Sequence, residues 1–275
     1  MNQESLIIEG DSADALTRLP DVSVQCILTS PPYWGLRDYG MDSQIGHEHT
    51  YQEYINRLVS VFKEARRVLA DDGTFWLIIG DGYTSGNRRY RAPDKKYPER
   101  TMSFRPDTPE GLKPKDLLGI PWRLALALQD DGWYLRCDVI WNKPNAMPES
   151  VKDRPTRSHE YIFLLSKKDK YFYNMEAVVE GNGRNQRSVW SINKQAYSEA
   201  HFATFPLELI KPCVLASTRP GDRVLDPFFG SGTVGVVCEA LNRSYVGIEL
   251  NPEYVDMATS RLKISPVQVL RVVSQ

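Results

Sequence analysis

The sequence has few cysteines and no long apolar run. None of its runs approaches the roughly 20 apolar residues that span a membrane. Its start, MNQESLIIEGD, lacks the basic region and apolar stretch of a secretory signal. We therefore expect a cytoplasmic protein that has no membrane partner. Neither disulfides nor zinc are expected, because the cysteines lie far apart, each in or beside an apolar run as reduced core thiols do: Cys26, Cys137, Cys213 and Cys238.

Histidine and net charge are also low. Of the 4 histidines, His47 and His49 form an H-x-H pair, but no third ligand is spaced nearby, so no metal site is expected. The 34 Lys and Arg residues nearly balance the 35 Asp and Glu residues, and the net charge of -1 gives no global sign of a polyanionic partner. A local basic face is compatible with this balance. The 275 residues, 41% of them hydrophobic, are enough for one domain over 1–275.

Short apolar runs alternate with helical patterns, which predicts an α/β fold with a mostly parallel sheet covered by helices on both faces. Before the last quarter we expect strands at 23–29, 73–79 and 134–141, helices at 52–69 and 120–130, and a hairpin at 160–173. In the last quarter we expect a strand at 223–226, a glycine turn, a helix at 233–241, a strand at 244–249 and a helix from Pro252 with Asn251 as its N-cap.

The segment RVLDPFFGSGTVG, residues 223–235, places glycines after a strand and before a helix, where a backbone can approach a ligand at a helix N-terminus. Gly230, Gly232 and Gly235 also satisfy G-x-G-x-x-G, so a nicotinamide enzyme is the obvious rival. Against it, an anion at Asp226 would repel a pyrophosphate but favour the cationic methionine end of S-adenosylmethionine. Only about 40 residues follow the motif, too few to complete a dinucleotide fold after its first strand.

Glu249 ends the next expected strand, where an acid can accept hydrogen bonds from both hydroxyls of a ribose. Both cofactors contain such a ribose, so this residue supports a nucleoside ligand without choosing between them. The alternative is that Asp226 only caps the turn and that Glu249 is a solvated strand end.

The segment TSPPYW, residues 29–34, stands at the carboxyl end of an expected strand, where open parallel sheets bind their ligands. The amino group of a base is a poor nucleophile because its lone pair is conjugated into the ring, and acceptors that hold its hydrogens favour a more tetrahedral nitrogen. The Ser30 hydroxyl and the Pro31 carbonyl can be these acceptors, and Tyr33 offers a face on which a flipped base can stack. Pro31 and Pro32 fix an extended backbone. The alternative is a rigid turn whose aromatics fill a core.

TSPPYW followed by DPFFGSGT resembles the permuted, or beta-class, amino-group DNA methyltransferases, in which the catalytic motif precedes the cofactor motif. The resemblance covers nearly the whole chain and includes GD at 10–11, WNKP at 141–144, HFATFP at 201–206 and GIELNPEY at 247–254. It implies a Rossmann-like methyltransferase fold with a circularly permuted motif order, S-adenosylmethionine as cofactor and double-stranded DNA as partner. The residues that would hold the cofactor are Asp11, Phe205, Pro206, Asp226, Phe228, Gly230, Gly232, Thr233 and Glu249.

By the same resemblance, Ser30, Pro31, Pro32 and Tyr33 carry catalysis. A serine before PPY is typical of members that methylate cytosine at N4, whereas members that methylate adenine at N6 usually carry Asp or Asn there. We therefore expect cytosine as the target base, with adenine as the alternative. An RNA or protein amino-group methyltransferase is a further alternative, but those families usually place the cofactor motif first. A non-catalytic nucleic-acid-binding module is another, against which the intact serine and prolines argue.

The stretch 83–116 breaks the regular pattern and forms a long basic loop dotted with aromatics, a mixture suited to phosphate contact with occasional stacking. A solvated charged face is the alternative. The residues expected to contact DNA are Trp34, Arg88, Arg89, Arg91, Lys143, Arg154 and Arg157. A small region at 145–200 is the candidate for DNA recognition, and Asp81 either touches substrate or caps a turn. The resemblance leaves a homodimer and a cognate restriction endonuclease open as partners.

Overall fold

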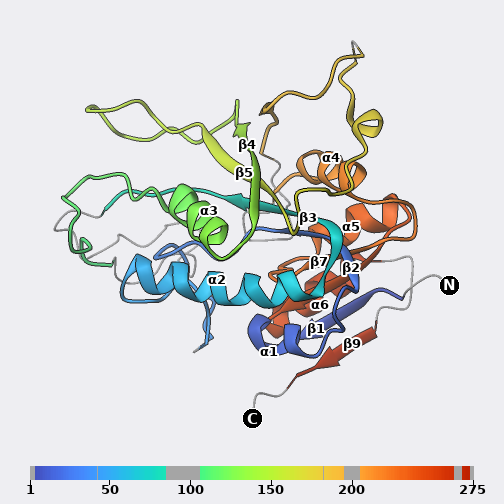
Figure 1. The fold of residues 1–275 in the computed structure, drawn as a ribbon. Coiled ribbons are helices and arrows are strands. Elements are labelled where there is room, and N and C mark those ends of the chain that lie inside the picture. The colour runs from blue at the N-terminus through green and yellow to red at the C-terminus, as the bar shows by residue number, and fades with distance from the viewer. Residues whose placement is uncertain are drawn as a thin grey trace.

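The computed structural model describes residues 4–41, 43–84, 106–181, 183–194, 205–262 and 268–272. In this part of the chain nine strands form one sheet, in the order β6-β4-β5-β3-β2-β7-β8-β1-β9 (Figure 1). The strands are β1 (Leu6–Glu9), β2 (Val24–Thr29), β3 (Leu69–Ile79), β4 (Tyr134–Asn142), β5 (His159–Ser166), β6 (Val189–Ser191), β7 (Arg223–Asp226), β8 (Ser244–Glu249) and β9 (Gln268–Arg271). Every neighbouring pair is parallel except the two that β5 forms with β3 and β4. The expected mostly parallel α/β sheet is confirmed.

Helices cover both faces of this sheet (Figure 1). They are α1 (Ser12–Thr17), α2 (Tyr51–Val68), α3 (Ile120–Asp130), α4 (Leu207–Ser217), α5 (Thr233–Ala240) and α6 (Pro252–Arg261), with a short 3-10 turn η2 (Met175–Val178). Buried side chains of α1, α2 and α3 share one hydrophobic cluster, and those of α4, α5 and α6 share a second. Along β2, Ile27 points into the first cluster while Cys26 and Leu28 point into the second, because successive strand residues face opposite sides.

Most of the expected elements are confirmed. The helix α3 and the strands β7 and β8 have the expected bounds, and α5, β2 and β4 differ from them by one residue at one end. The helix α2 begins and ends one residue earlier than expected. β3 begins four residues earlier than expected because Leu69 already pairs with Val24 across a β-bulge. Asn251 is the N-cap of α6, where its side chain accepts a hydrogen bond from the Glu253 N–H at 2.9 Å.

The hairpin expected at 160–173 is wrong. β5 ends at Ser166, and an irregular segment follows it instead of a second strand. β5 pairs antiparallel with β3 and β4, which precede it in the sequence. In the segment after β5, the Phe172 N–H donates to the Asp72 carbonyl of β3 at 2.8 Å. Local periodicity marks an extended segment but does not say which strand it pairs with, and this is where the expectation failed.

Several short elements were not expected: β1, β6, β9, η2 and α4. Of these, β1 matters most for the site, because it pairs with β8 so that Glu9 lies opposite Glu249. The GD segment that follows β1 therefore reaches the same end of the sheet as the acid that ends β8.

Three further findings concern the described residues alone. None of the helices there is long and apolar enough to cross a membrane. No group of His, Cys, Asp and Glu side chains among them could hold a metal ion. All four cysteines are free thiols, and three of them are buried.

Candidate active site

The strand order brings the two sequence motifs together. β2, which ends in TSPPYW, lies between β3 and β7, and β7 leads into the glycine turn. The connections from β2 and β7 run to opposite halves of the sheet, so a crevice opens at the carboxyl ends of these strands. There the Thr29 hydroxyl donates to Asp226 Oδ1 over 2.6 Å, although the two residues lie 197 positions apart. The permuted motif order is thus compatible with one continuous site.

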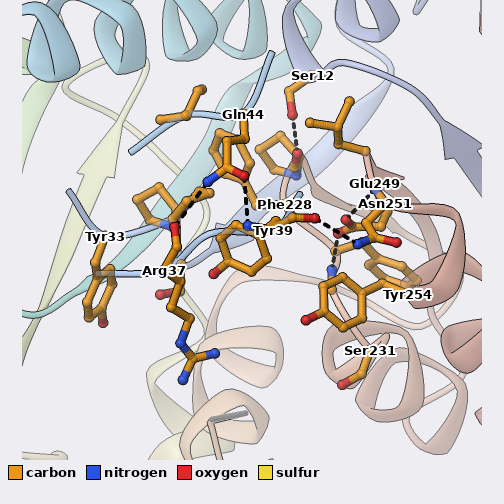
Figure 2. A pocket seen from close by; sticks show the side chains of 18 of the residues that line it. Ser12, Tyr33, Arg37, Tyr39, Gln44, Phe228, Ser231, Glu249, Asn251 and Tyr254 are labelled. Carbon is orange, nitrogen blue, oxygen red and sulfur yellow. Dashed lines mark hydrogen bonds between the residues drawn. The ribbon is translucent and has the colours of Figure 1, made fainter. Parts of the chain in front are cut away.

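A cavity of about 340 Å³ occupies this crevice. Figure 2 shows Tyr33 at one end of it and Glu249, Asn251 and Tyr254 at the other, with Tyr39 between them. The sequence-predicted residues that line it are Asp11, Ser30, Pro31, Pro32, Tyr33, Lys143, Phe205, Phe228, Gly230, Thr233 and Glu249. Residues predicted for the cofactor and for the chemistry therefore share one cavity.

At the cofactor end, the glycine turn is joined to the end of β8. The Gly230 N–H donates to Glu249 Oε2 at 2.7 Å, and the Asn251 N–H donates to Glu249 Oε1 at 2.9 Å. Gly230 has a φ of +51°, in the left-handed region that favours glycine, and a Cβ built there would meet nothing within 4 Å. The backbone at Gly230 is therefore open to a ligand. Removal from bulk water raises the pKa of Glu249 to about 7, and the three backbone hydrogen bonds to its carboxylate oppose this rise.

Asp226 is buried, with 1% of its surface exposed, and it does not line the cavity. Its Oδ1 accepts the Thr29 hydroxyl and the Phe228 N–H, the latter at 3.0 Å. Burial raises the pKa of Asp226 to about 7, while these hydrogen bonds lower it and the charge of Glu249 raises it. Asp226 thus fixes the turn between β7 and α5, and its contact with the methionine end of a cofactor stays a prediction.

The start of α1 closes the cofactor end. Asp11 caps α1 by accepting the Ala13 N–H at 2.8 Å, and the Ser12 hydroxyl donates to the Pro227 carbonyl at 2.5 Å. Figure 2 shows this second bond between α1 and the glycine turn. Ser12 was not predicted as a site residue, since a serine beside a helix start is ordinary in sequence.

Besides Asp226, two further residues predicted for the cofactor do not line the cavity, namely Gly232 and Pro206. Gly232 has a φ of +79°, and a Cβ there would lie 3.0 Å from the Cβ of Ala258 in α6. Glycine is therefore required at this position by the turn and by packing against α6. Pro206 stands at the N-cap of α4. Direct cofactor contacts of both residues stay predictions.

At the other end, the two prolines of TSPPYW differ in their surroundings. The Pro32 carbonyl accepts the hydroxyl of Tyr54, a fully buried residue of α2, at 2.7 Å. This bond leaves the Pro31 carbonyl as the candidate acceptor for an amino group beside Ser30. Tyr54 is a supporting residue that the sequence did not reveal, because it reads as one more apolar position of an amphipathic helix.

Tyr33 is held by a side chain that sequence reasoning missed. Its hydroxyl donates to Glu160 Oε2 at 2.9 Å, and Lys143 Nζ donates to the other oxygen of that carboxylate. Burial raises the pKa of Tyr33 well above its usual range, the charge of Glu160 adds to the rise, and Ser30 opposes it. Tyr33 is therefore a neutral donor. One feature of the sequence could have revealed Glu160: it is an acid near the start of the mostly apolar strand β5, where a buried charge needs a partner.

The residues predicted to contact DNA lie in several places. Trp34 donates its indole N–H to the Glu48 carbonyl at 2.9 Å and lines a smaller pocket with Tyr83 and Pro106. Lys143 lies inside the main cavity, with 10% of its side chain exposed. The three arginines of the basic loop, Arg88, Arg89 and Arg91, lie outside the described residues.

Arg154 and Arg157 both approach the ring of Tyr83, at 3.8 and 5.8 Å from its centroid. Arg154 also pairs with Glu149 at 2.6 Å, and Arg157 pairs with Asp81 at 3.5 Å. The carboxylate of Asp81 accepts the N–H groups of Gly82, Gly119 and Ile120. Of the two expectations for Asp81, the structure supports the cap, here at the start of α3.

The residues that line the cavity fit S-adenosylmethionine in their chemistry. An acid at the end of β8 can accept a ribose hydroxyl, because the Glu249 carboxylate offers about four lone-pair sites, more than its three backbone hydrogen bonds occupy. Apolar and aromatic walls from Phe228, Ile248 and Tyr254 suit an adenine ring. The open side of Gly230 gives the backbone a close approach. Glu249, Asp11 and Phe228 are thus the residues that would hold this cofactor.

Comparison with known proteins gives a consistent result. The family model described as DNA methylase matches residues 24–260. The Type II methyltransferase M.Cfr9I of Citrobacter freundii is 67% identical over 97% of this chain and 90% of its own length.

Two solved structures have a similar fold. The PvuII DNA methyltransferase (cytosine-N4-specific) has a TM-score of 0.74 at 22% identity, covering 98% of this chain and 89% of the other. TTHA0409 of Thermus thermophilus, in complex with S-adenosyl-L-methionine, has a TM-score of 0.67 at 23% identity, covering 97% and 99%. At this identity the likeness confirms the Rossmann-like methyltransferase fold. Because the family model and the 67% identical relative both cover most of the sequence, the chain belongs to the DNA methylase family.

Proposed function

We propose that this protein transfers a methyl group from S-adenosylmethionine to the exocyclic N4 amino group of cytosine in double-stranded DNA. The observation that carries the proposal is the single cavity shared by Ser30, Tyr33 and the Gly230 turn, joined by the bond between Thr29 and Asp226. Membership of the DNA methylase family supports the reaction type, and the name of the PvuII enzyme supports cytosine.

In the proposed reaction the bound cofactor supplies an electrophilic methyl group on a sulfonium. The chain's own residues prepare the amino group: the Ser30 hydroxyl and the Pro31 carbonyl accept its two hydrogens, and Tyr33 stacks on the flipped base. Holding both reactants in one cavity avoids most of the entropy cost of bringing them together. No strong base is needed first, because the methylated nitrogen cation is acidic and can pass a proton to Ser30 or to water.

Nucleoside analysis tests the target base. DNA from a methylation-free host is treated with the protein and the cofactor, digested and analysed by mass spectrometry. We expect 4-methylaminocytosine. Finding only 6-methylaminoadenine would contradict the cytosine assignment but leave amino-group methylation in place. Sequencing the treated DNA with a method that maps modified bases would also give the recognition sequence.

The proposed DNA-binding surface combines the basic loop with Arg154 and Arg157. Replacing Arg88, Arg89 and Arg91 with alanine should weaken DNA binding across all sequences. It should also flatten the salt dependence, since each phosphate contact adds about 0.9 to the slope of log affinity against log salt. If the variant keeps the parent's DNA affinity and salt slope, the loop does not contact DNA and is a solvated charged surface.

The remaining proposals concern organisation and partners. We propose one methyltransferase domain over 1–275, with DNA recognition in the region 145–200. A homodimer and a cognate restriction endonuclease are proposed from the family resemblance. A cytoplasmic location is proposed as well. Light scattering on the purified protein tests the proposed homodimer, because a monomer at micromolar concentration would contradict it.

A further inference from the structure

Three polar side chains form a chain of contacts at the end of the cavity that holds TSPPYW, which we call the base end. The Tyr33 hydroxyl donates to Glu160 Oε2 at 2.9 Å, and Lys143 Nζ donates to Glu160 Oε1. All three side chains line the cavity. Only Tyr33 belongs to the motif that performs the chemistry, so the roles of the other two need an explanation.

The antiparallel pair β4 and β5 fixes this arrangement from outside the parallel part of the sheet. Glu160 lies opposite Trp141 in the ladder, and the Lys143 N–H donates to the Ser158 carbonyl at 2.7 Å, which extends the pairing beyond β4. Lys143 and Glu160 are therefore diagonal neighbours on one face, a spacing that long side chains can bridge. Their backbones are held by ladder bonds, so the carboxylate has a rigid base.

Packing restricts both side chains further. A Cβ built on Gly80 would lie 2.8 Å from Tyr33 Cε2 and 3.2 Å from Glu160 Cδ, so the backbone of Gly80 lies directly against both. The ammonium of Lys143 lies 4.1 Å from the centroid of the Trp141 ring. With 10% of the Lys143 side chain and 21% of the Glu160 side chain exposed, solvent screens this pair little.

We propose that Glu160 and Lys143 are positioning residues that set the orientation of the Tyr33 ring against which the target base stacks. The inference rests on the proposed base-methylating function. Tyr33 stands on a loop after β2, and its hydroxyl is the part of the ring farthest from that loop. Fixing the hydroxyl fixes the plane of the ring. Lys143 holds the second oxygen of Glu160, which selects one orientation of the carboxylate and balances its charge.

This role makes a different demand on each residue. Glu160 must offer an oxygen acceptor to Tyr33, so an amide can replace the carboxylate in part, whereas alanine cannot. Tyr33 must offer a hydroxyl, which Phe lacks while keeping the ring. If both act through one contact, removing either should have the effect of removing both.

The test is single-turnover methyl transfer to plasmid DNA from a methylation-free host, in the parent, E160A, E160Q, Y33F and the double variant Y33F/E160A. We expect E160A and Y33F each to lower the rate about tenfold or more, because a small misplacement of the base relative to the methyl donor slows transfer. E160Q should stay within a few-fold of the parent, and the double variant should be no slower than either single variant. The affinity for S-adenosylmethionine should be unchanged throughout. Glu64→Gln, at an ion pair with Arg67 on α2, is the matched control and should match the parent.

Two outcomes would overturn the proposal. In the first, the rate of the double variant is lowered by the product of the two single effects. In the second, Y33F transfers methyl at the parent's rate while E160A is slow. In either case Glu160 would act without Tyr33. Lys143→Met separates positioning from phosphate contact. It should lower the rate less than E160A and leave the salt dependence of DNA binding unchanged. A flatter salt slope would make Lys143 a DNA contact instead.

A spectroscopic readout keeps this inference distinct from the proposed function. The protein contains 14 tyrosines, and labelling with 3-fluorotyrosine allows the Tyr33 resonance to be assigned by its loss in Y33F. We expect E160A to shift and broaden that fluorine resonance and E160Q to shift it less. A Tyr33 resonance that is unchanged in E160A would overturn the inference even if the parent methylates DNA. If the parent transfers no methyl group, the proposed function fails, while the fluorine spectra still decide whether Glu160 orients Tyr33.

Discussion

At the cofactor end of the cavity, backbone groups hold an acidic side chain, whereas at the base end side chains hold one another. The N–H groups of Gly230 and Asn251 donate to Glu249 at 2.7 and 2.9 Å. At the opposite end, Tyr33 depends on Glu160, which in turn is paired with Lys143. The first arrangement is part of a strand, turn and helix. The second depends on two strands that belong to another part of the sheet.

This difference has consequences for function. Backbone donors in a regular turn are rigid, so they suit a cofactor that every reaction cycle uses in the same way. Side chains can be exchanged without rebuilding the fold, so they suit the part of the site that distinguishes one base from another. We therefore expect substitutions at the base end to change turnover and those at the cofactor end to change cofactor affinity.

The largest expected effect is that of Ser30→Ala. Losing the hydroxyl removes one acceptor for the amino group and one route for its proton, so turnover should fall on the order of 10²-fold or more. Calorimetry should give the parent's affinity for S-adenosylmethionine, because Ser30 lies at the base end. Ser60→Ala, on the exposed side of α2, is the matched control and should match the parent in both assays. An equal loss of cofactor affinity in Ser30→Ala would mean that the two ends are not separable.

The same contrast explains how much the sequence could predict. The bounds of β7 and β8 agree with expectation because strand, glycine turn and helix follow one another within 27 residues, and each has a local signal. Gly230 and Glu249 are 19 positions apart, so their proximity follows from that local order. The cofactor end was therefore predictable in outline. Exceptions are Asp226 and Gly232, whose buried settings only the folded chain reveals.

The base end was predictable only as far as TSPPYW. Tyr33 and Glu160 are 127 positions apart, and their contact depends on β5 pairing antiparallel with β3. The expected hairpin instead paired β5 with a partner inside 160–173, which left Glu160 without a place in the site. Strand pairing is set by contacts between distant segments, which a local pattern does not contain. Lys143 was likewise expected to contact DNA, because its pairing with Glu160 could not be predicted from the sequence.

An intermediate effect is expected from pH at the cofactor end. Burial raises the pKa values of Asp226 and Glu249 to about 7, above those of exposed carboxyls. Binding a cationic cofactor favours the ionised forms. Affinity for S-adenosylmethionine should therefore fall as the pH is lowered from 8 to 6. The fall should be up to about tenfold over this whole range for each group that must ionise, because the ionised fraction of a group with a pKa of about 7 falls by that factor. Calorimetry at several pH values measures this, and Asp226→Asn should flatten the profile. A flat profile in the parent would contradict the expectation.

The stability of the cofactor-free protein should change with pH in the direction opposite to the cofactor affinity. A carboxyl whose pKa is raised by folding stabilises the folded chain when protonated, and this contribution is complete below its unfolded pKa. It is lost as the pH rises through about 7 for Asp226 and Glu249. The cofactor-free protein should therefore lose this contribution between about pH 4 and pH 7. The cofactor-induced rise in melting temperature should grow over pH 6 to 8, and scanning calorimetry with and without cofactor checks both trends.

The smallest expected effect is that of Tyr54→Phe, which tests whether the two prolines have separate roles. The Tyr54 hydroxyl donates to the Pro32 carbonyl at 2.7 Å inside the protein, so its loss leaves that carbonyl without this donor. The free energy of unfolding should fall by about 1 kcal/mol. Turnover should fall only a few-fold, because the Pro31 carbonyl is the proposed acceptor for the amino group. Urea unfolding and single-turnover transfer measure the two quantities.

The matched control for this variant is Tyr245→Phe, whose hydroxyl lies 3.4 Å from Glu239, away from the cavity. It should change stability less and leave turnover at the parent's value, because a bond of that length is weak. If Tyr54→Phe instead lowered turnover as much as Ser30→Ala, the Pro32 carbonyl would be part of the chemistry. The base end would then depend on α2 as much as on β4 and β5, and the contrast between a backbone-built end and an end built from side chains would no longer hold.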